Sequence, residues 1–381
     1  MPGGDAVRLC FIADAGSIHT QKWVNYFARK GHEIHLISRR AGQGYIEGVK
    51  LYLLPRLALP IWAVSKYPSA LLNLFPARRL IKRIKPDILN AHYITLHGYL
   101  GAFSAFHPFI LTAMGSDVHT DPQRNPLYRI LTQKTLKKAD LIICDSQMVR
   151  EKLIELGTAP SKIRVICNGV DTQLFNPEKR DERLRQELGL ADSPIVISTR
   201  TLSPLYNVKT LIEAVPLVVK DFPQAKFVIA GDGNQRNYLT NLTNSLGVSN
   251  SVKFLGWVPN NELPKYLVSS DIYVSTSLAD STSLCLQEAM ACELAPVVTD
   301  LPANREWVAN GKNAFIVPTK DPQALAEKIS YLLRNGEVRR KIGKAGREII
   351  KERAEYQREM AKMEQLYQEL ADTEYKREIK C

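Results

Sequence analysis

Residues 271–293 read DIYVSTSLADSTSLCLQEAMACE, and they form one complete unit of the pattern that organises the chain. The first part is a short apolar run bounded by polar residues, which is typical of a buried strand. The second part is apolar and long enough for a helix, which we expect to begin near Leu284. Thr282 or Ser283 is the expected N-cap, because a side-chain hydroxyl can accept a hydrogen bond from an amide of the first helical turn.

Two carboxylates, Asp280 and Glu288, stand eight positions apart across this loop and helix. Backbone amides at the positive end of a helix can bind an anion, and acids beside them can accept hydrogen bonds from hydroxyl groups of the same ligand. The amides concerned belong to Ser281, Thr282, Ser283 and Leu284. The structural alternative is that the hydroxyl residues only cap the helix and that Glu288 pairs with a neighbouring lysine.

The alternation of short apolar runs and amphipathic segments extends outward in both directions. One series starts with VRLCFIAD at 7–14, and a second starts with IVISTRTL at 195–202. Near-continuously apolar strands that alternate with helices predict parallel sheets covered on both faces. A polar, proline-flanked segment near 175–193 separates the two series, and the chain beyond about 322 has a helical pattern throughout.

We therefore expect two doubly wound, Rossmann-like α/β domains that face one another across a cleft. A chain of 381 residues is too long for one ordinary core. The expected domains are 1–178 and 179–355, and a last helix in 356–381 is expected to pack back toward the first domain. In open sheets of this kind, ligands bind outside the carboxyl ends of the strands.

Composition places the protein among soluble globular proteins, with 45% hydrophobic and 24% charged residues. No apolar run approaches the roughly 20 residues that a membrane-spanning helix needs. The six cysteines show no metal-ligand spacing, and most lie in apolar runs, as reduced thiols of a cytoplasmic protein do.

The net charge of +12 is concentrated in the first half, where residues 1–175 hold 23 basic and 12 acidic side chains. Between Glu47 and Asp87 there are eight bases and no acid, and ARRLIKRIK at 77–85 predicts a basic amphipathic helix. The stretch 50–85 therefore predicts a contact with an anionic membrane surface, with the protein peripheral on the inner face of the membrane. An ordinary helix that covers the sheet with a solvated basic face is the alternative.

The segment 280–293 resembles the motif of two acids separated by seven residues in retaining glycosyltransferases of GT-B architecture, family 4 (glycosyl transferase group 1). Those enzymes typically carry E-G-F-G-x-x-x-x-E-A-M-A-C-G, and here the segment reads D-S-T-S-L-C-L-Q-E-A-M-A-C-E. The resemblance extends over nearly the whole chain through RKGHEIHLIS, TAMGSDV, ADLIICDS, IRVICNGVDTQLFNP, RTLSP, NVKTLIEA, FVIAGDG, VKFLGWVP and NAFIVPT, in that order.

The resemblance implies a retaining hexosyltransferase that takes a sugar from a nucleotide-diphosphate-sugar, UDP- or GDP-linked, and works in polysaccharide or glycolipid biosynthesis. It implies that Glu288 binds the ribose hydroxyls, that Asp280 contacts the donor sugar, and that the loop amides hold the distal phosphate. The first domain would bind the acceptor, a glycan or a lipid-linked molecule, and the second domain would bind the donor. Asp280 replaces the usual Glu, which shortens the reach by about 1.5 Å.

Further donor-site candidates follow other strands. Arg200 can hold a phosphate with two nitrogens, unless it forms a surface ion pair. Tyr206 stands where the family carries a lysine; Lys209, the nearest base, could replace it or could be a solvated helix lysine. The small residues expected near the donor are Gly16, Gly231 and Gly233.

On the acceptor side, His19 lies in a predicted loop after the first strand, where it contacts phosphate, acceptor or only solvent. Met114 stands where many relatives carry histidine, so Asp117 becomes the polar candidate, with a helix-capping role as its alternative. The leaving diphosphate can accept the acceptor's proton, which leaves electrostatic stabilisation as the main task of the protein. No D-x-D motif lies at a suitable strand end, so neither a metal nor another cofactor is expected.

Two other classes were weighed. A nucleotide-sugar epimerase would need additional acids and histidines in the cleft, and a phosphorylase of similar fold would need a lysine for pyridoxal phosphate. A basic nucleic-acid-binding module would agree with the net charge, but the sequence has no aromatic–basic RNA motif and no zinc spacing. We therefore expect no nucleic-acid partner.

Overall fold

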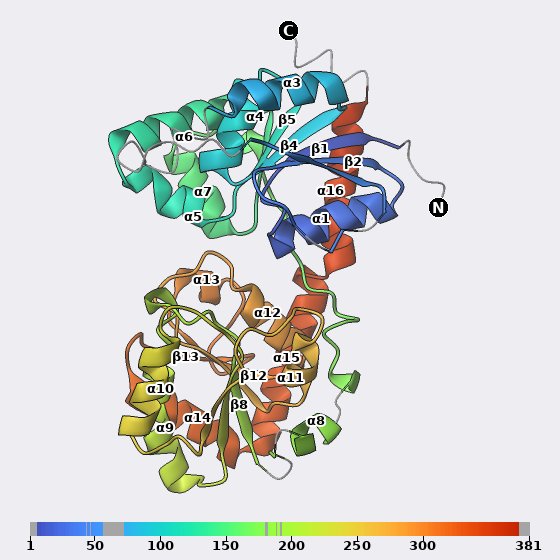
Figure 1. The fold of residues 1–381 in the computed structure, drawn as a ribbon. Coiled ribbons are helices and arrows are strands. Elements are labelled where there is room, and N and C mark those ends of the chain that lie inside the picture. Colours follow the sequence, from blue (N-terminus) through green and yellow to red (C-terminus); the bar gives the residue numbers. More distant parts are fainter. Residues whose placement is uncertain are drawn as a thin grey trace. The chain divides into compact units, whose positions relative to one another are not determined.

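The computed structural model describes residues 6–42, 44–45, 47–55, 72–179, 182–187, 189–190 and 193–372. The chain divides into two compact units, and each is described by itself (Figure 1). Unit 1 is formed by 1–168 and 358–381, and unit 2 by 169–357.

Unit 1 contains a seven-stranded sheet in the order β3-β2-β1-β4-β5-β6-β7, and all of its strand pairs are parallel. Its strands are β1 (Arg8–Ile12), β2 (Glu33–Ser38), β3 (Val49–Leu53), β4 (Ile88–His92), β5 (Phe109–Thr112), β6 (Leu141–Cys144) and β7 (Ile163–Val165). Its helices are α1 (Ile18–Arg29), α3 (Leu74–Ile84), α4 (Tyr99–Phe103), α5 (Ser116–His119), α6 (Pro126–Lys138) and α7 (Gln147–Glu155). The order reverses between β1 and β4, which is where doubly wound sheets open a crevice.

Unit 2 contains a six-stranded parallel sheet in the order β10-β9-β8-β11-β12-β13. Its strands are β8 (Ile195–Ser198), β9 (Lys226–Ile229), β10 (Val252–Phe254), β11 (Ile272–Ser275), β12 (Ala295–Thr299) and β13 (Phe315–Val317). Its helices are α8 (Glu182–Glu187), α9 (Val208–Asp221), α10 (Arg236–Ser245), α11 (Leu263–Val268), α12 (Leu284–Ala291), α13 (Pro302–Arg305), α14 (Pro322–Arg334) and α15 (Gly336–Arg353). The predicted pair of parallel, doubly wound sheets is confirmed, as is the helical end of the chain.

The last helix, α16 (Tyr356–Ala371), packs in unit 1 beside α1, as the sequence predicted (Figure 1). The ring of Tyr367 lies 4.9 Å from that of Phe27 on α1 and 6.3 Å from that of Phe11 on β1. Asn90 Nδ2 on β4 donates to Tyr367 Oη at 2.6 Å. The last helix of the chain thus completes one face of the first sheet.

Helix α3 belongs to the core on the other face of this sheet. Its apolar positions Ala77, Ile81 and Ile84 are buried, and Leu80 packs against the same core. The predicted basic amphipathic helix is confirmed, but its apolar side is used inside unit 1. The remainder of the predicted membrane stretch, 56–71, lies outside the described residues.

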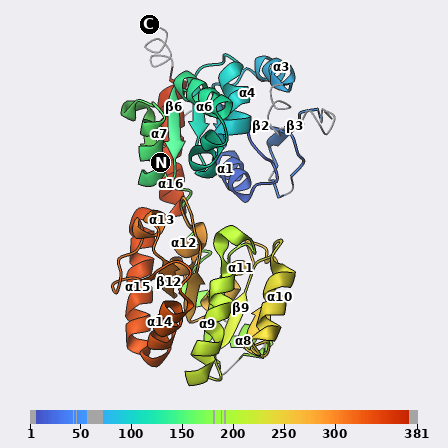
Figure 2. The ribbon, with the colours of Figure 1, turned by 90° about the vertical axis from the view of Figure 1, so that its left-hand side faces the viewer.

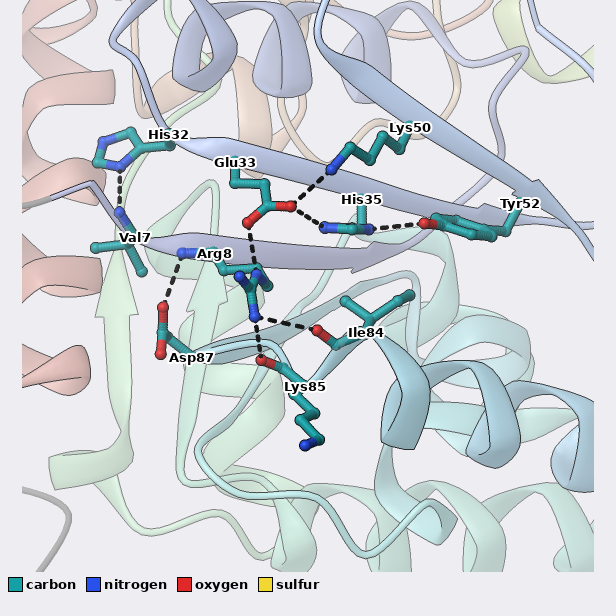
Figure 3. A network of polar contacts seen from close by, with 10 residues as sticks. All are labelled: Val7, Arg8, His32, Glu33, His35, Lys50, Tyr52, Ile84, Lys85 and Asp87. Carbon is teal, nitrogen blue, oxygen red and sulfur yellow. Dashed lines mark hydrogen bonds and ion pairs between the residues drawn. The ribbon is translucent and has the colours of Figure 1, made fainter.

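A polar network at the amino ends of β1 and β2 ties this helix to the sheet (Figure 3). Glu33 accepts from Arg8 Nε at 2.6 Å and from Lys50 Nζ at 2.7 Å. Arg8 Nη1 also reaches the carbonyls of Ile84 and Lys85, at the end of α3. Hydrogen bonds from Lys50 and Arg8 hold the pKa of Glu33 at about 2, so the network is charged at neutral pH.

None of the helices in the described part of the chain is both long enough and apolar enough to cross a membrane.

Candidate functional site

Unit 2 brings two loops together at the point where its strand order reverses. Strands β8 and β11 are neighbours in the sheet although the sequence between them contains β9 and β10. Arg200 follows β8, and Asp280 follows β11. Because both strands are parallel, their carboxyl ends meet at one edge, and this edge is where open α/β sheets bind ligands.

Arg200 is held at this edge by three groups. Its Nη2 donates to Asp280 Oδ2 at 2.7 Å, and its Nη1 donates to Ser283 Oγ at 3.1 Å. The guanidinium carbon lies 4.0 Å from the centre of the Tyr206 ring. Arg200 is only 5% exposed, so it is not the surface ion pair that was the alternative. Its Nε is buried without a partner among the described residues, which leaves donor capacity at the site.

The amino end of α12 lies against this pair. Ser283 is the N-cap, and its Oγ accepts from Leu286 N at 3.4 Å, so the predicted helix start and cap are confirmed. Two of the four amides predicted to hold an anion are engaged locally: Ser281 N donates to Asp280 Oδ1 at 3.1 Å, and Leu284 N donates to Thr282 O at 3.1 Å. These two amides are therefore less available to a ligand, and the anion site at this end of the helix stays a prediction.

Glu288 lies one turn further along α12 and is only 2% exposed. Asn260 Nδ2 lies 3.3 Å from Glu288 Oε1, which brings the loop after β10 to the same edge of the sheet. Sequence reasoning missed Asn260. The only feature of the sequence that could have pointed to Asn260 is its position directly after VKFLGWVP, one of the segments that carry the family resemblance.

Gly231 and Gly233 lie in the loop after β9, where that loop packs on the backbone around Arg200. A Cβ at Gly231 would lie 2.2 Å from Arg200 O, and one at Gly233 would lie 2.3 Å from Leu202 O. Leu202 N donates to Asp232 O at 2.9 Å, which holds the two loops together. Both glycines are thus required by close packing beneath the site, whatever they contribute to a ligand.

Lys209 lies in the first turn of α9, where its Nζ is 3.3 Å from Glu213 Oε1 and 46% of its side chain is exposed. This position agrees with the solvated helix lysine that was its alternative, and the contact of Lys209 with the donor stays a prediction. The sequence position of the family's lysine is occupied by Tyr206, whose ring stacks on Arg200 instead.

The residues of unit 1 that the sequence predicted for the site are not joined by hydrogen bonds or ion pairs to one another in the described residues, unlike Arg200, Asp280 and Ser283 in unit 2. Gly16 is exposed, and its N–H donates to Asp14 Oδ1 at 2.9 Å. His19 lies in the first turn of α1 and not in the loop, because Ser17 already takes the N-cap position. Asp117 is fully buried and accepts from Ile94 N at 2.7 Å and from Met114 N at 3.0 Å. Burial raises the pKa of Asp117 to about 6.

Sequence reasoning also passed over His92 and His97, which lie at and just beyond the end of β4. His92 is buried against the Trp23 ring, with a distance of 4.9 Å between ring centres, and neither ring nitrogen has a partner among the described residues. Burial lowers the pKa of His92 to about 3 and that of His97 to about 4, so both are neutral at pH 7. Buried Nδ1 of His19 lacks a described partner as well, and burial lowers the pKa of this histidine to about 4.

In the described residues, no three side chains of His, Cys, Asp or Glu come close enough together to hold a metal ion.

Comparisons with known proteins agree with this geometry. The family model described as glycosyl transferases group 1 matches 180–349, and the model described as glycosyl transferase 4-like matches 8–146. A putative glycosyltransferase of Bacillus subtilis (strain 168), EpsD, is 26% identical over 339 residues, which cover 85% of this chain and 86% of that protein. The UDP-Gal:alpha-D-GlcNAc-diphosphoundecaprenol alpha-1,3-galactosyltransferase of Escherichia coli is 28% identical over 303 residues, 76% of this chain and 77% of that protein.

Among solved structures, Anabaena Alr3699/HepE in complex with UDP matches with a TM-score of 0.78. It is 20% identical, and the match covers 94% of this chain and 99% of that chain. The two units therefore have the GT-B fold of glycosyltransferases. The chain belongs to the glycosyl transferase group 1 family, the retaining family 4, and is a glycosyltransferase that uses a nucleotide-sugar donor.

Proposed function

We propose that this enzyme transfers a sugar from a UDP-sugar to a lipid-linked acceptor, and that the donor binds at the carboxyl edge of the unit 2 sheet. The observation that carries the donor site is the buried Arg200–Asp280 pair at the amino end of α12, with Glu288 one turn away. The names of two relatives support the substrates. One is crystallised with UDP, and the other takes UDP-Gal and acts on a diphosphoundecaprenol-linked sugar.

In this proposal, each side chain has a separate task. Glu288 accepts hydrogen bonds from the ribose hydroxyls, with Asn260 holding its carboxylate. Arg200 and the amide dipoles of α12 stabilise the negative charge that grows on the diphosphate as the sugar leaves. Asp280 and Ser283 position the guanidinium, because they occupy its two terminal nitrogens. In the same proposal, Asp280 also contacts the donor sugar.

The acceptor hydroxyl then attacks from the face that the diphosphate leaves, and the leaving oxygen takes its proton. The bond from sugar to diphosphate breaks as the bond to the acceptor forms, and the anomeric configuration is retained. No protein nucleophile is needed. The proposal also includes the contacts that the sequence predicted for other residues. His19 and Asp117 would contact the acceptor, and Gly16 and Lys209 would contact the donor.

The basic stretch 50–85 belongs to the same proposal, because a lipid-linked acceptor must be reached at a membrane surface. The bases of α3 are exposed, and of its apolar residues Ala77, Ile81 and Ile84 are buried while Phe75 is 75% exposed, so this helix can contribute attraction to anionic lipid. A peripheral position at the inner face of the membrane follows.

The test is thermal unfolding with a panel of UDP, GDP, ADP and CMP and their common sugar conjugates. A ligand at about 100 times its Kd stabilises the folded state by about 2.7 kcal/mol, which raises Tm by several degrees. We expect UDP and one UDP-sugar to give the shift. Glu288→Gln should remove it, whereas Glu327→Gln, an exposed carboxylate on α14, should leave it unchanged. Undiminished UDP affinity in Glu288→Gln would disprove the assignment of Glu288.

A further inference from the structure

Helix α6 carries aliphatic side chains on its outer face. Leu127 is 61% exposed and Ile130 is 48% exposed. The buried side of the same helix is formed by Tyr128, Thr132, Thr135 and Leu136. A helix that only covers a sheet has the opposite arrangement, with aliphatic residues inward and polar residues outward. The exposed Leu and Ile of α6 therefore do not serve the core of unit 1.

The same outer face is basic. At about 100° per residue, Leu127, Ile130, Lys134 and Lys137 fall within an arc of about 80° around the helix. No acid occurs between Asp121 and Asp140, while this stretch holds five bases: Arg124, Arg129, Lys134, Lys137 and Lys138. Within the part of the chain that the structure describes, Arg129, Lys134 and Lys137 form no ion pair. The charge of α6 is thus available to an outside partner.

A second basic helix lies near α6 in unit 1. The short helix α4 contacts both α3 and α6, so the three helices cover one region of the unit (Figure 2). The exposed bases of α3 and of its C-cap are Arg78, Arg79, Lys82, Arg83 and Lys85. The apolar side of α3 is buried in the core, but Phe75 in its first turn is 75% exposed. Helix α3 can therefore supply charge and one aromatic ring, and α6 can supply charge and aliphatic groups.

We propose that α6 is a membrane-docking helix whose outer face lies on an anionic phospholipid surface. Leu127 and Ile130 enter the boundary between headgroups and acyl chains, and Lys134 and Lys137 lie against lipid phosphates. Charge decides against a second copy of this chain, because two-fold pairing would bring equal basic faces together. The two exposed aliphatic residues on this face decide against nucleic acid, whose phosphates are bound by bases alone. This docking adds α6 to the membrane contact proposed for the stretch 50–85, and it does not depend on the proposed glycosyl transfer.

The test is flotation of the whole protein with vesicles of phosphatidylcholine alone and of phosphatidylcholine with phosphatidylglycerol in equal parts. We expect binding to the anionic vesicles only, weakened by salt. Lys134→Gln with Lys137→Gln should lower the partition coefficient about 30-fold, about fivefold for each charge. Leu127→Ser with Ile130→Ser should lower it at least about tenfold.

The matched controls lie in unit 2. The double variant Leu217→Ser with Leu246→Ser changes two aliphatic residues that are 40% and 38% exposed. It should bind anionic vesicles as the wild type does. Lys341→Gln with Lys344→Gln is the control for lost charge at exposed positions. If the serine variant fails to fold, the lysine variant of α6 still tests the proposal. For every variant, the Tm without ligand reports folding, and the rise of Tm with UDP reports donor binding.

Unchanged partitioning of both α6 variants would overturn the proposal, and so would a wild-type protein that ignores anionic vesicles. A change in sedimentation coefficient of the α6 variants, without a change in vesicle binding, would assign the face to a protein partner instead. Loss of the UDP shift in the wild type would contradict the proposed donor and leave the docking result untouched.

Discussion

Arg200 and Asp280 are eighty positions apart in the chain, and their side chains meet because β8 and β11 are parallel neighbours. Their nitrogen–oxygen distance is 2.7 Å, and only 6% of the Arg200 side chain and 13% of the Asp280 side chain are exposed. A buried charge is costly to leave unpaired, so we expect this pair to be important for folding, apart from the role in donor binding that we propose for it.

Asp280→Ala should therefore lower the free energy of unfolding by about 3 kcal/mol, because Arg200 stays buried without its carboxylate. Urea unfolding measures the loss. Asp300→Ala removes an ion pair with Arg305 whose side chains are 43% and 59% exposed, and it should cost at most about 1 kcal/mol. Equal costs for the two variants would contradict the buried character of the Arg200 pair.

Asp117 predicts a pH dependence of stability. Its pKa is raised from 3.8 to about 6 by burial, so between these values the folded protein binds the proton that the unfolded chain releases. The contribution of this group to the free energy of unfolding is full below about pH 4 and decreases as pH rises through about 6. The difference in unfolding free energy between wild type and Asp117→Asn, measured across this window, should decrease with rising pH. A difference that is constant with pH would show that folding does not raise the pKa of Asp117.

The helices position these side chains through their ends. Helix α12 begins at the site because Ser283 caps it, and the same hydroxyl oxygen accepts from Arg200. One side chain thus couples the start of a helix to the orientation of a buried cation. In unit 1, Ser146 caps α7 in the same way, with its Oγ 3.3 Å from Val149 N, but no ligand site has been assigned to that end.

Ser283→Ala should cost about 1 kcal/mol of stability through the lost cap, and it should weaken UDP binding as Arg200 loses a partner. Ser146→Ala should cost a similar amount of stability and leave UDP binding unchanged. Calorimetric titration with UDP, combined with urea unfolding, separates the two effects. If Ser283→Ala bound UDP like the wild type, Ser283 would have a capping role only.

In the molecule as a whole, the chain passes between the units at 168–169 and again at 357–358. On the unit 2 side, the two passages are joined by hydrogen bonds: Val170 N donates to Ala354 O at 2.8 Å, and Tyr356 N donates to Val170 O at 3.0 Å. Gly169 has a φ of +68°, and a Cβ there would lie 2.7 Å from Tyr356 Cα. Only glycine suits this crossing.

Tyr367→Ala should lower the free energy of unfolding by about 4 kcal/mol, because a fully buried ring of α16 leaves a cavity against β1 and α1. Tyr367→Phe removes only the hydrogen bond with Asn90 and should cost about 1 kcal/mol. Tyr331→Ala on α14 is the matched control: the residue is 41% exposed and its ring makes an edge contact with Phe315, so the change should cost about 1 kcal/mol. These values are read from urea unfolding of the full chain. A small effect of Tyr367→Ala would mean that α16 is not needed for unit 1.

The return of the last helix to the first unit was expected without a local signal, whereas local pattern was enough to predict the alternating strands and helices, the two parallel sheets and the start of α12 at Leu284. These features depend on apolar periodicity and capping chemistry, which neighbouring residues carry. Only the tertiary structure pairs Arg200 with Asp280 and brings Asn260 to Glu288. It also decides that Asp117 and the apolar side of α3 are buried, and that Leu127 and Ile130 of α6 face outward. Such contacts join strand ends far apart in the chain, or depend on which side of a helix meets the sheet, and no local pattern contains that information.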